Sequence, residues 1–319
     1  MSVKNENEYE DLLGLWSDLE AGLGVILTSP DSVQEFEQRV WQYDRWLHSL
    51  LERDADVGLY LLFQLASNSS VGYSASHALI CGVLCHLIAD ELKLGVKERN
   101  SLVHAALTMN IAMTVLQDQL ALQTDKLSVQ QLDAIRAHAA KGGLILANLG
   151  VSDELWVEIV ASHHDENSEK LELRLMAPRK RLVRILRVVD RYAAMISPRK
   201  SREGRSATES VRSIMSGNAS YNDEIGHALL RAVGLCPPGT YVRLEDSTLA
   251  VVMRRSAKPN LPHVAIVTGP NGEVLPQPRL HRTISGRPAI QAALASAVVR
   301  LRLNHHLMLQ LGAYAAQQP

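Results

Sequence analysis

Cysteine is scarce in this sequence and no export signal precedes it. The 319 residues include three cysteines, Cys81, Cys85 and Cys236. An odd number without a signal peptide does not predict a disulfide framework. Free thiols persist in a reducing compartment, so we expect a cytoplasmic protein.

Charge of one sign and long apolar runs are also missing. Lys and Arg number 33 and Asp and Glu 34, so the chain as a whole carries no basic excess of the kind that binds nucleic-acid polymers or anionic membranes. No stretch reaches the roughly 18 uninterrupted apolar residues of a membrane span. The most apolar window, 78–89, is short and contains Cys85 and His86. We therefore expect neither a nucleic-acid polymer nor a membrane as partner, and we find no internal repeat.

What the sequence does contain is apolar residues at helical spacing. The apolar content of 46% is ample for a sizeable core, and the length is typical of about two domains. Helical spacing runs through 12–65, and Ser128 with Gln131 three residues later has the spacing of a capping box. Further helices are predicted over 76–92, 96–120, 128–149, 153–164 and 179–195.

A β-rich pattern begins after residue 239. The runs 240–244 and 249–254 predict a hairpin, and Asn271-Gly272 predicts a second one between 264–268 and 273–275. Ser285 with Pro288 then predicts a last helix to about residue 311. Its apolar face includes Ile290, Leu294, Ala297, Val298 and Leu301.

These patterns together predict a mostly α fold. We expect an N-terminal helical region over 1–69, a helical domain over 70–216, a small β-module over 236–285 and a C-terminal helix over 286–319.

Titratable side chains are concentrated in the stretch 160–167, which contains His163, His164, Asp165 and Glu166. Adjacent helical residues point roughly 100° apart, so two neighbouring histidines reach one centre only where the helix turns or ends. Two interpretations stay open. The stretch is either a helix end that lines a cavity or a solvated C-terminus, where histidine suits the helix dipole.

Other candidate ligands lie on neighbouring helices. His77, Cys81 and Cys85 share one helix face, which is typical either of core packing or of a zinc site. Asp190 lies on an apolar helix, where a lone carboxylate is costly unless a cation accompanies it. Histidines on other helices, His138 among them, could hold that cation.

The order of these residues resembles the HD-GYP family, over 70–216. Members are helical metal-dependent phosphodiesterases of the HD phosphohydrolase superfamily and cleave cyclic di-GMP. The resemblance implies an HD-domain helical bundle, and the segment 236–244 is similar to the small β-module that often follows such domains. The resemblance places metal ligands at His77, His138, His163, His164 and Asp190.

Several functional side chains of the family are replaced in this chain. The family's His-Asp pair and the lysine after it correspond to Met109, Asn110 and Met113, and a glutamate ligand one turn before His77 corresponds to Tyr73. The GYP motif is absent after the paired histidines. The resemblance is therefore to a degenerate member.

Losing those groups should impair a two-metal centre. In such a centre the ions lower the pKa of a shared water from about 15.7 towards about 7. Carboxylate ligands fall from three to Asp190 alone, so we expect at most one divalent metal, iron, manganese or zinc, on some of the histidines and Asp190. Asp165 or Glu166 could compensate.

Basic side chains follow Asp190. Arg199 and Arg202 stand where the family holds substrate phosphates, and a bidentate guanidinium suits that role. The alternative is a solvated basic loop. The later pair His305-His306 has no acid nearby in the sequence and is expected on the surface of the last helix.

Two functions follow from this pattern. The favoured one is a catalytically impaired regulatory, nucleotide-binding or scaffold protein that senses a cyclic dinucleotide, because the missing groups are those that make the nucleophile. The alternative is an active metal-dependent phosphodiesterase with an altered centre. A further hypothesis makes the N-terminal helices a dimer or partner surface, through Trp41, Trp46, Leu50 and Leu51.

Overall fold

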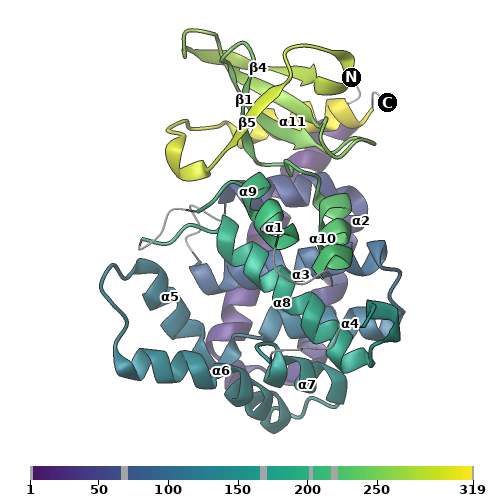
Figure 1. Ribbon diagram of the computed structural model, residues 1–319, viewed down its shortest axis with the longest axis vertical. Coiled ribbons are helices and arrows are strands. Elements are labelled where there is room, and N and C mark those ends of the chain that lie inside the picture. The colour runs from purple at the N-terminus through teal and green to yellow at the C-terminus, as the bar shows by residue number, and fades with distance from the viewer. Residues whose placement is uncertain (1–2, 66–70, 166–170, 201–203, 217–221, 318–319) are drawn as a thin grey trace.

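A helical body carries a small β-sheet at one end (Figure 1). The computed structural model describes residues 3–65, 71–165, 171–200, 204–216 and 222–317. Its α-helices are α1 Val3–Thr28, α2 Phe36–Leu65, α3 Tyr73–Glu91, α4 Val96–Thr108, α5 Thr114–Leu122, α6 Val129–Asn148, α7 Glu154–Ser162, α8 Pro178–Ile196, α9 Ala207–Met215, α10 Asn222–Val233 and α11 His305–Ala316. Its strands are β1 Tyr241–Leu244, β2 Leu249–Arg254, β3 His263–Thr268, β4 Val274–Arg282 and β5 Ile290–Leu294. The predicted mostly α fold with a C-terminal β-module followed by a helix is confirmed.

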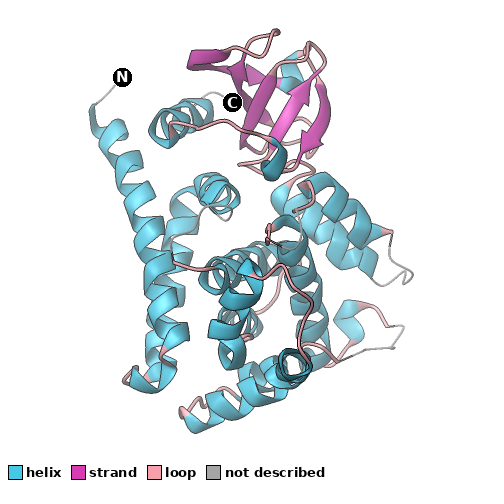
Figure 2. Ribbon diagram, turned by 90° about the vertical axis from the view of Figure 1, so that its left-hand side faces the viewer, coloured by secondary structure: helices cyan, strands magenta, loops and turns pink. Residues whose placement is uncertain are grey.

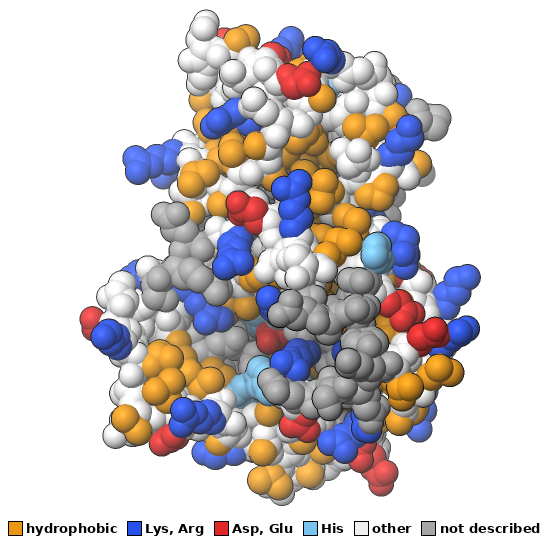
Figure 3. Space-filling view, in the orientation of Figure 1, with side chains coloured by type: hydrophobic (Ala, Val, Ile, Leu, Met, Phe, Trp, Pro, Cys, Tyr) orange, Lys and Arg blue, Asp and Glu red, His pale blue; other side chains and the backbone are white. Residues whose placement is uncertain are grey.

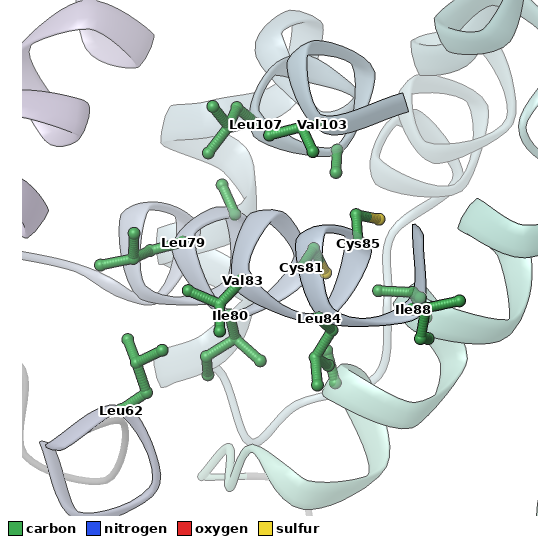
Figure 4. Packing of buried hydrophobic residues seen from close by; sticks show 14 of the residues in the cluster. Leu62, Leu79, Ile80, Cys81, Val83, Leu84, Cys85, Ile88, Val103 and Leu107 are labelled. Atoms are coloured by element: carbon green, nitrogen blue, oxygen red, sulfur yellow. The ribbon is translucent and has the colours of Figure 1, made fainter. Parts of the chain in front are cut away.

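Helix α3 lies at the centre of the helical body and packs against α4, α8 and α10. Figure 4 shows Cys81 and Cys85 of this helix among apolar side chains that include Val103 and Leu107 of α4. Among the described helices α3 alone is long and apolar enough to cross a membrane, and 83% of its most apolar window is buried inside the protein. Its apolar surface is therefore used in the core.

Most predicted helices are present within a few residues of their expected ends. The Ser128 and Gln131 side chains form the expected capping box at the start of α6. The single helix predicted over 96–120 is wrong, because α4 ends at Thr108 and α5 begins only at Thr114. A short 3₁₀ turn, Ile111–Met113, separates them and packs against α6. No proline or glycine marks this break in the sequence, so the apolar spacing alone concealed it.

The strands form one antiparallel sheet, drawn in magenta in Figure 2. Their order in the sheet is β4-β3-β2-β1-β5. Both predicted hairpins, β1 with β2 and β3 with β4, are present. The helix predicted from residue 285 is wrong over its first part, because Ile290–Leu294 is strand β5 and the last helix begins only at His305. Val242 of β1 pairs with Ala293 of this segment. Pairing with β1 therefore makes the segment a strand, although its apolar residues have helical spacing.

Both faces of the sheet are covered by apolar side chains. Val242, Val252 and Val264 face a small core of the module itself. Residues next to them in the strands, such as Tyr241 and Val251, belong instead to the large core of the helical body, as the alternation of side chains along a strand requires. The first and last helices, α1 and α11, also pack together at this end of the molecule. One apolar core therefore connects the N-terminal helices, the later helices and the sheet.

Candidate metal centre

Three imidazoles meet where α7 ends beside α6. Helix α7 stops at Ser162, and His163 and His164 follow in a turn. The His138 Nε2 atom of α6 lies 3.2 Å from His163 Nε2 and 3.3 Å from His164 Nε2. The helix end thus allows two adjacent histidines to reach one centre. His138 and His163 are buried and His164 is exposed.

Two glycines allow α6 and α7 to approach this closely. A Cβ atom at Gly142 would lie 3.0 Å from Val160 Cγ1, and one at Gly143 would lie 2.8 Å from the Ala161 Cβ. Larger residues there would push α7 away from α6 and separate His138 from the paired histidines.

The hydrogen bonds of the ring nitrogens show what this cluster fits. His138 Nδ1 lies 2.5 Å from the Ile135 carbonyl oxygen, and His163 Nδ1 lies 2.7 Å from that of Val160. Each Nδ1 therefore donates its proton, which leaves lone pairs on two Nε2 atoms that face each other. Burial lowers the pKa of His163 to about 4 and also lowers that of His138. At neutral pH these rings are therefore unprotonated at Nε2, and no proton lies between the facing lone pairs. A divalent metal ion fits these donors.

A second group of possible ligands lies nearby on α3 and α8. Asp190 Oδ1 is 2.8 Å from His77 Nε2, and Cys81 Sγ is 3.7 Å from the same nitrogen. Burial alone would raise the pKa of Asp190. The hydrogen bond from His77 and the charges of His77, His163 and His164 outweigh burial and lower that pKa, so Asp190 lies within electrostatic reach of the first group.

The α3 face that carries His77, Cys81 and Cys85, for which core packing and a zinc site were both open, divides between the two interpretations. His77 and Cys81 lie beside Asp190, whereas Cys85 belongs to neither ligand group in the described part of the chain. Burial raises the pKa of both thiols. Cys85 therefore packs as a core residue, and Cys81 is a neutral thiol unless a metal displaces its proton.

Arg199 is held by Tyr73 beside the second group. The Tyr73 ring stacks on His77 with centroids 5.5 Å apart, and Arg199 Nη2 donates to the Tyr73 hydroxyl at 2.8 Å. The guanidinium also lies over the ring, 4.6 Å from its centroid. Arg199 itself is half-buried. Arg202 lies outside the described residues.

The remaining predicted positions that the structure describes supply no carboxylate to either group. Met109 is 1% exposed and packs in the apolar core, and Asn110 and Met113 are half-buried. Asp165 is exposed, 3.8 Å from Arg179 Nη2. Glu166 lies outside the described residues. Among the residues that the structure describes, Asp190 is the one carboxylate in the two ligand groups.

Basic side chains lie beside the histidine triad. Arg187 Nη1 is 3.4 Å from the Asp165 carbonyl oxygen, and in Figure 3 Lys and Arg side chains lie beside a histidine on the surface of the helical body. Arg187 was not predicted, although it lies three residues before Asp190 on the same helix.

Other histidines lie away from this centre. In a buried group that was not predicted, His86 Nε2 and His104 Nε2 lie 2.7 and 3.2 Å from the two oxygens of Asp44. The surface position expected for His305 is wrong, because it is half-buried with its Nδ1 3.0 Å from the Tyr60 hydroxyl. Neither position had a signal in the sequence, because each partner lies far away along the chain.

A curated protein and a solved structure are among the known proteins that are similar to this chain. No family model matches the sequence. The chain is 25% identical over 208 residues to the cyclic di-GMP phosphodiesterase PA4108 of Pseudomonas aeruginosa, a match that covers 62% of this chain and 48% of the relative. This chain therefore matches only about half of that relative's length. Among solved structures it is similar to Bd1817, an HDG"Y"P protein from Bdellovibrio bacteriovorus, with 12% identity and a TM-score of 0.48 over 72% of each chain.

Proposed function

We propose that this chain is a degenerate HD-GYP-like protein that holds one divalent cation and binds a cyclic dinucleotide without efficient cleavage. It would act as a regulatory or scaffold protein in cytoplasmic cyclic dinucleotide signalling. The observation that carries the proposal is the chemistry of the ligands. In the two described groups Asp190 is the one carboxylate, and the other five donors are four imidazoles and one thiol.

Two adjacent divalent cations need more negative charge than this site offers. One carboxylate leaves most of the charge of two dications uncompensated, and close cations in a partly buried site repel each other strongly. Arg199 adds a further positive charge through its contact with Tyr73. A single cation on the triad of His138, His163 and His164, with Asp190 within electrostatic reach, avoids this repulsion. Such a cation would polarise a bound phosphate oxygen, but the site would lack the second ion that helps to form an attacking hydroxide.

One observation favours the alternative function, an active phosphodiesterase with an altered metal centre. The relative at 25% identity is a cyclic di-GMP phosphodiesterase, and three imidazoles with one carboxylate resemble the ligand sets of catalytic mononuclear sites. This alternative predicts measurable cleavage by the metal-loaded protein.

Binding and turnover of cyclic di-GMP separate the two functions. We expect calorimetry to detect binding and chromatography to detect no linear product. Changing Arg199→Ala should weaken binding about tenfold, as expected for a charge-assisted contact to phosphate. The matched control is Arg136→Ala, which removes an exposed arginine on α6. Steady product formation would favour the alternative, and absence of binding would contradict both functions.

A further inference from the structure

A hollow of about 750 Å³ opens between α2, α4 and α7, apart from the metal ligands. Trp41 of α2, Lys97 and His104 of α4, and the first residues of α7 line it. Helices α4 and α7 lie at the end of the helical body away from the sheet (Figure 1). The hollow meets the beginning of α7, whereas the histidine triad lies at the end of that helix.

An exposed indole forms one wall of this hollow. Trp41 is 49% exposed, although Leu50 and Leu51 of the same predicted partner surface are buried and Trp46 is half-buried. The predicted surface of four residues is therefore reduced to Trp41. The indole stacks on His104 with centroids 6.2 Å apart and planes 22° apart. It thus has a fixed support on one side and solvent on the other.

A buried charge network holds that supporting histidine in place. His104 Nε2 lies 3.2 Å from Asp44 Oδ2, and His86 Nε2 lies 2.7 Å from Asp44 Oδ1. Because the His104 Nε2–H donates to Asp44, its Nδ1 has a lone pair to offer. Within the described part of the chain this buried Nδ1 atom has no hydrogen-bond partner. His104 Nδ1, in the wall below Trp41, is therefore a hydrogen-bond acceptor that has no donor among the described residues.

The lining is predominantly acidic. It contains four carboxylates, Glu37, Asp153, Glu154 and Glu158, against the single cation Lys97. Glu37 and Asp153 are tied to neighbouring groups, since Ser152 donates to Glu37 and Ser101 donates to Asp153. Glu154 and Glu158 are exposed and lie one turn apart on α7. An aromatic face, acceptors and negative charge together suit a cation with several N–H donors.

We propose that this hollow binds the guanidinium group of an arginine presented by a protein partner. A guanidinium is planar and stacks on an indole while its N–H groups bond to carboxylates, whereas an ammonium is a compact, strongly hydrated charge. A hot-spot pair of tryptophan and arginine is typical of protein interfaces. The inference does not depend on the metal centre or on cyclic dinucleotide binding.

Binding of capped tetra-arginine to the 319-residue chain tests the proposal. We expect tetra-arginine to bind at least fivefold more tightly than tetra-lysine in a calorimetric or fluorescence titration. Trp41→Ala should weaken binding at least fivefold, and Trp41→Phe should weaken it less. The double variant Glu154→Gln with Glu158→Gln should weaken binding at least tenfold. Circular dichroism identifies any variant that fails to fold.

The matched controls lie on other surfaces. Tyr314→Ala removes an exposed aromatic of α11, and Asp125→Asn with Asp133→Asn removes two exposed acids elsewhere. Both controls should bind tetra-arginine within twofold of the parent chain. Equal weakening by the control acids, or no weakening by folded Trp41→Ala, would overturn the proposal. Tighter binding of spermidine than of tetra-arginine would instead show a polyamine site and would also overturn it.

Discussion

Histidine occupies two kinds of buried environment in this protein. His138 and His163 donate Nδ1–H to backbone carbonyls and turn bare Nε2 atoms towards each other. His86 and His104 instead place their Nε2 atoms on the Asp44 carboxylate. In the first arrangement two ring lone pairs face each other with no positive charge between them, which suits a metal ion. In the second arrangement the Asp44 carboxylate already accepts a hydrogen bond from each ring. The partner of one ring nitrogen thus decides what the other can bind.

Two substitutions at positions 109 and 110 test the metal centre at this scale. Met109→His combined with Asn110→Asp introduces the imidazole and the carboxylate that the resemblance to the HD-GYP family implies at these positions. Because the introduced imidazole and the introduced carboxylate both favour a second cation, bound divalent metal should rise from about one towards two ions per chain. Metal analysis of the purified variant measures this. The matched control is Met253→His, which adds an imidazole in the core beneath the sheet. No gain in metal would show that apolar packing around Met109 has filled the space.

The Asp44 carboxylate predicts a specific loss of stability in acid. Burial alone would raise its pKa, but the hydrogen bonds from His104 and His86 outweigh burial and lower it. The folded state thus binds this proton less tightly than the unfolded chain, so the stabilisation is present above the unfolded pKa of about 4 and is lost as pH falls through the lowered folded value.

Asp44→Asn should therefore reduce the free energy of unfolding by about 3 kcal/mol at pH 7, because it breaks a buried charged group. In urea unfolding at several pH values, the difference from the parent chain should shrink below about pH 4. The exposed Asp31→Asn serves as control. A difference that does not change with pH would contradict the assigned role of the carboxylate.

Single residues show how far the sequence could predict the site. The histidine pair, His138 and Asp190 stood out because titratable groups on apolar helices are rare. The Asp44 group was missed because His86 lies 42 residues and His104 60 residues from Asp44. Such a pairing depends on helix packing and not on local spacing. The contact between Arg199 and Tyr73 was not predicted either, because it too depends on helix packing.

At the scale of elements, helix α2 contains a break that joins the body to the sheet. Asp54 within it has an extended conformation, with φ −164° and ψ 96°. Its Oδ1 accepts hydrogen bonds from the backbone N–H of Asp56 and of Val57. Its Oδ2 lies 2.7 Å from Arg254 Nη1 at the end of β2. One side chain therefore caps the second half of α2 and contacts the sheet.

Two substitutions separate these contributions. Asp54→Asn keeps an oxygen for the cap but removes the charge, and should cost about 2 kcal/mol because Arg254 then loses one of its two carboxylate partners, Asp54, and keeps Asp56. Asp54→Ala removes both and should cost about 1 kcal/mol more, the usual contribution of a cap. Chemical unfolding of both variants measures the difference. Equal losses would show that the cap contributes nothing.

Helix and strand boundaries were predictable where local signals mark them. The capping box at Ser128 and the Asn271-Gly272 turn were confirmed. The break after Thr108 and the strand Ile290–Leu294 were not predictable, because apolar spacing continued through both segments. Packing of the 3₁₀ turn against α6 and pairing of β5 with β1 decided those conformations.

For the molecule as a whole, the large apolar core connects parts that the sequence separates. Side chains of α1, α2, the later helices and one face of the sheet belong to it. Contacts such as Gln64 Nε2 with the Gly239 carbonyl oxygen cross from the body to the sheet. The histidine triad and Asp190 are therefore held by elements that support one another, which suits a ligand site that must keep its geometry.

The central claim is that a centre with a single carboxylate holds one divalent cation. Elemental analysis of the full chain, purified without chelator, measures this most directly. We predict about one iron, manganese or zinc ion per chain, reduced by His138→Ala and by Asp190→Asn, with no detectable cleavage of cyclic di-GMP. Two ions per chain together with steady cleavage would contradict the account.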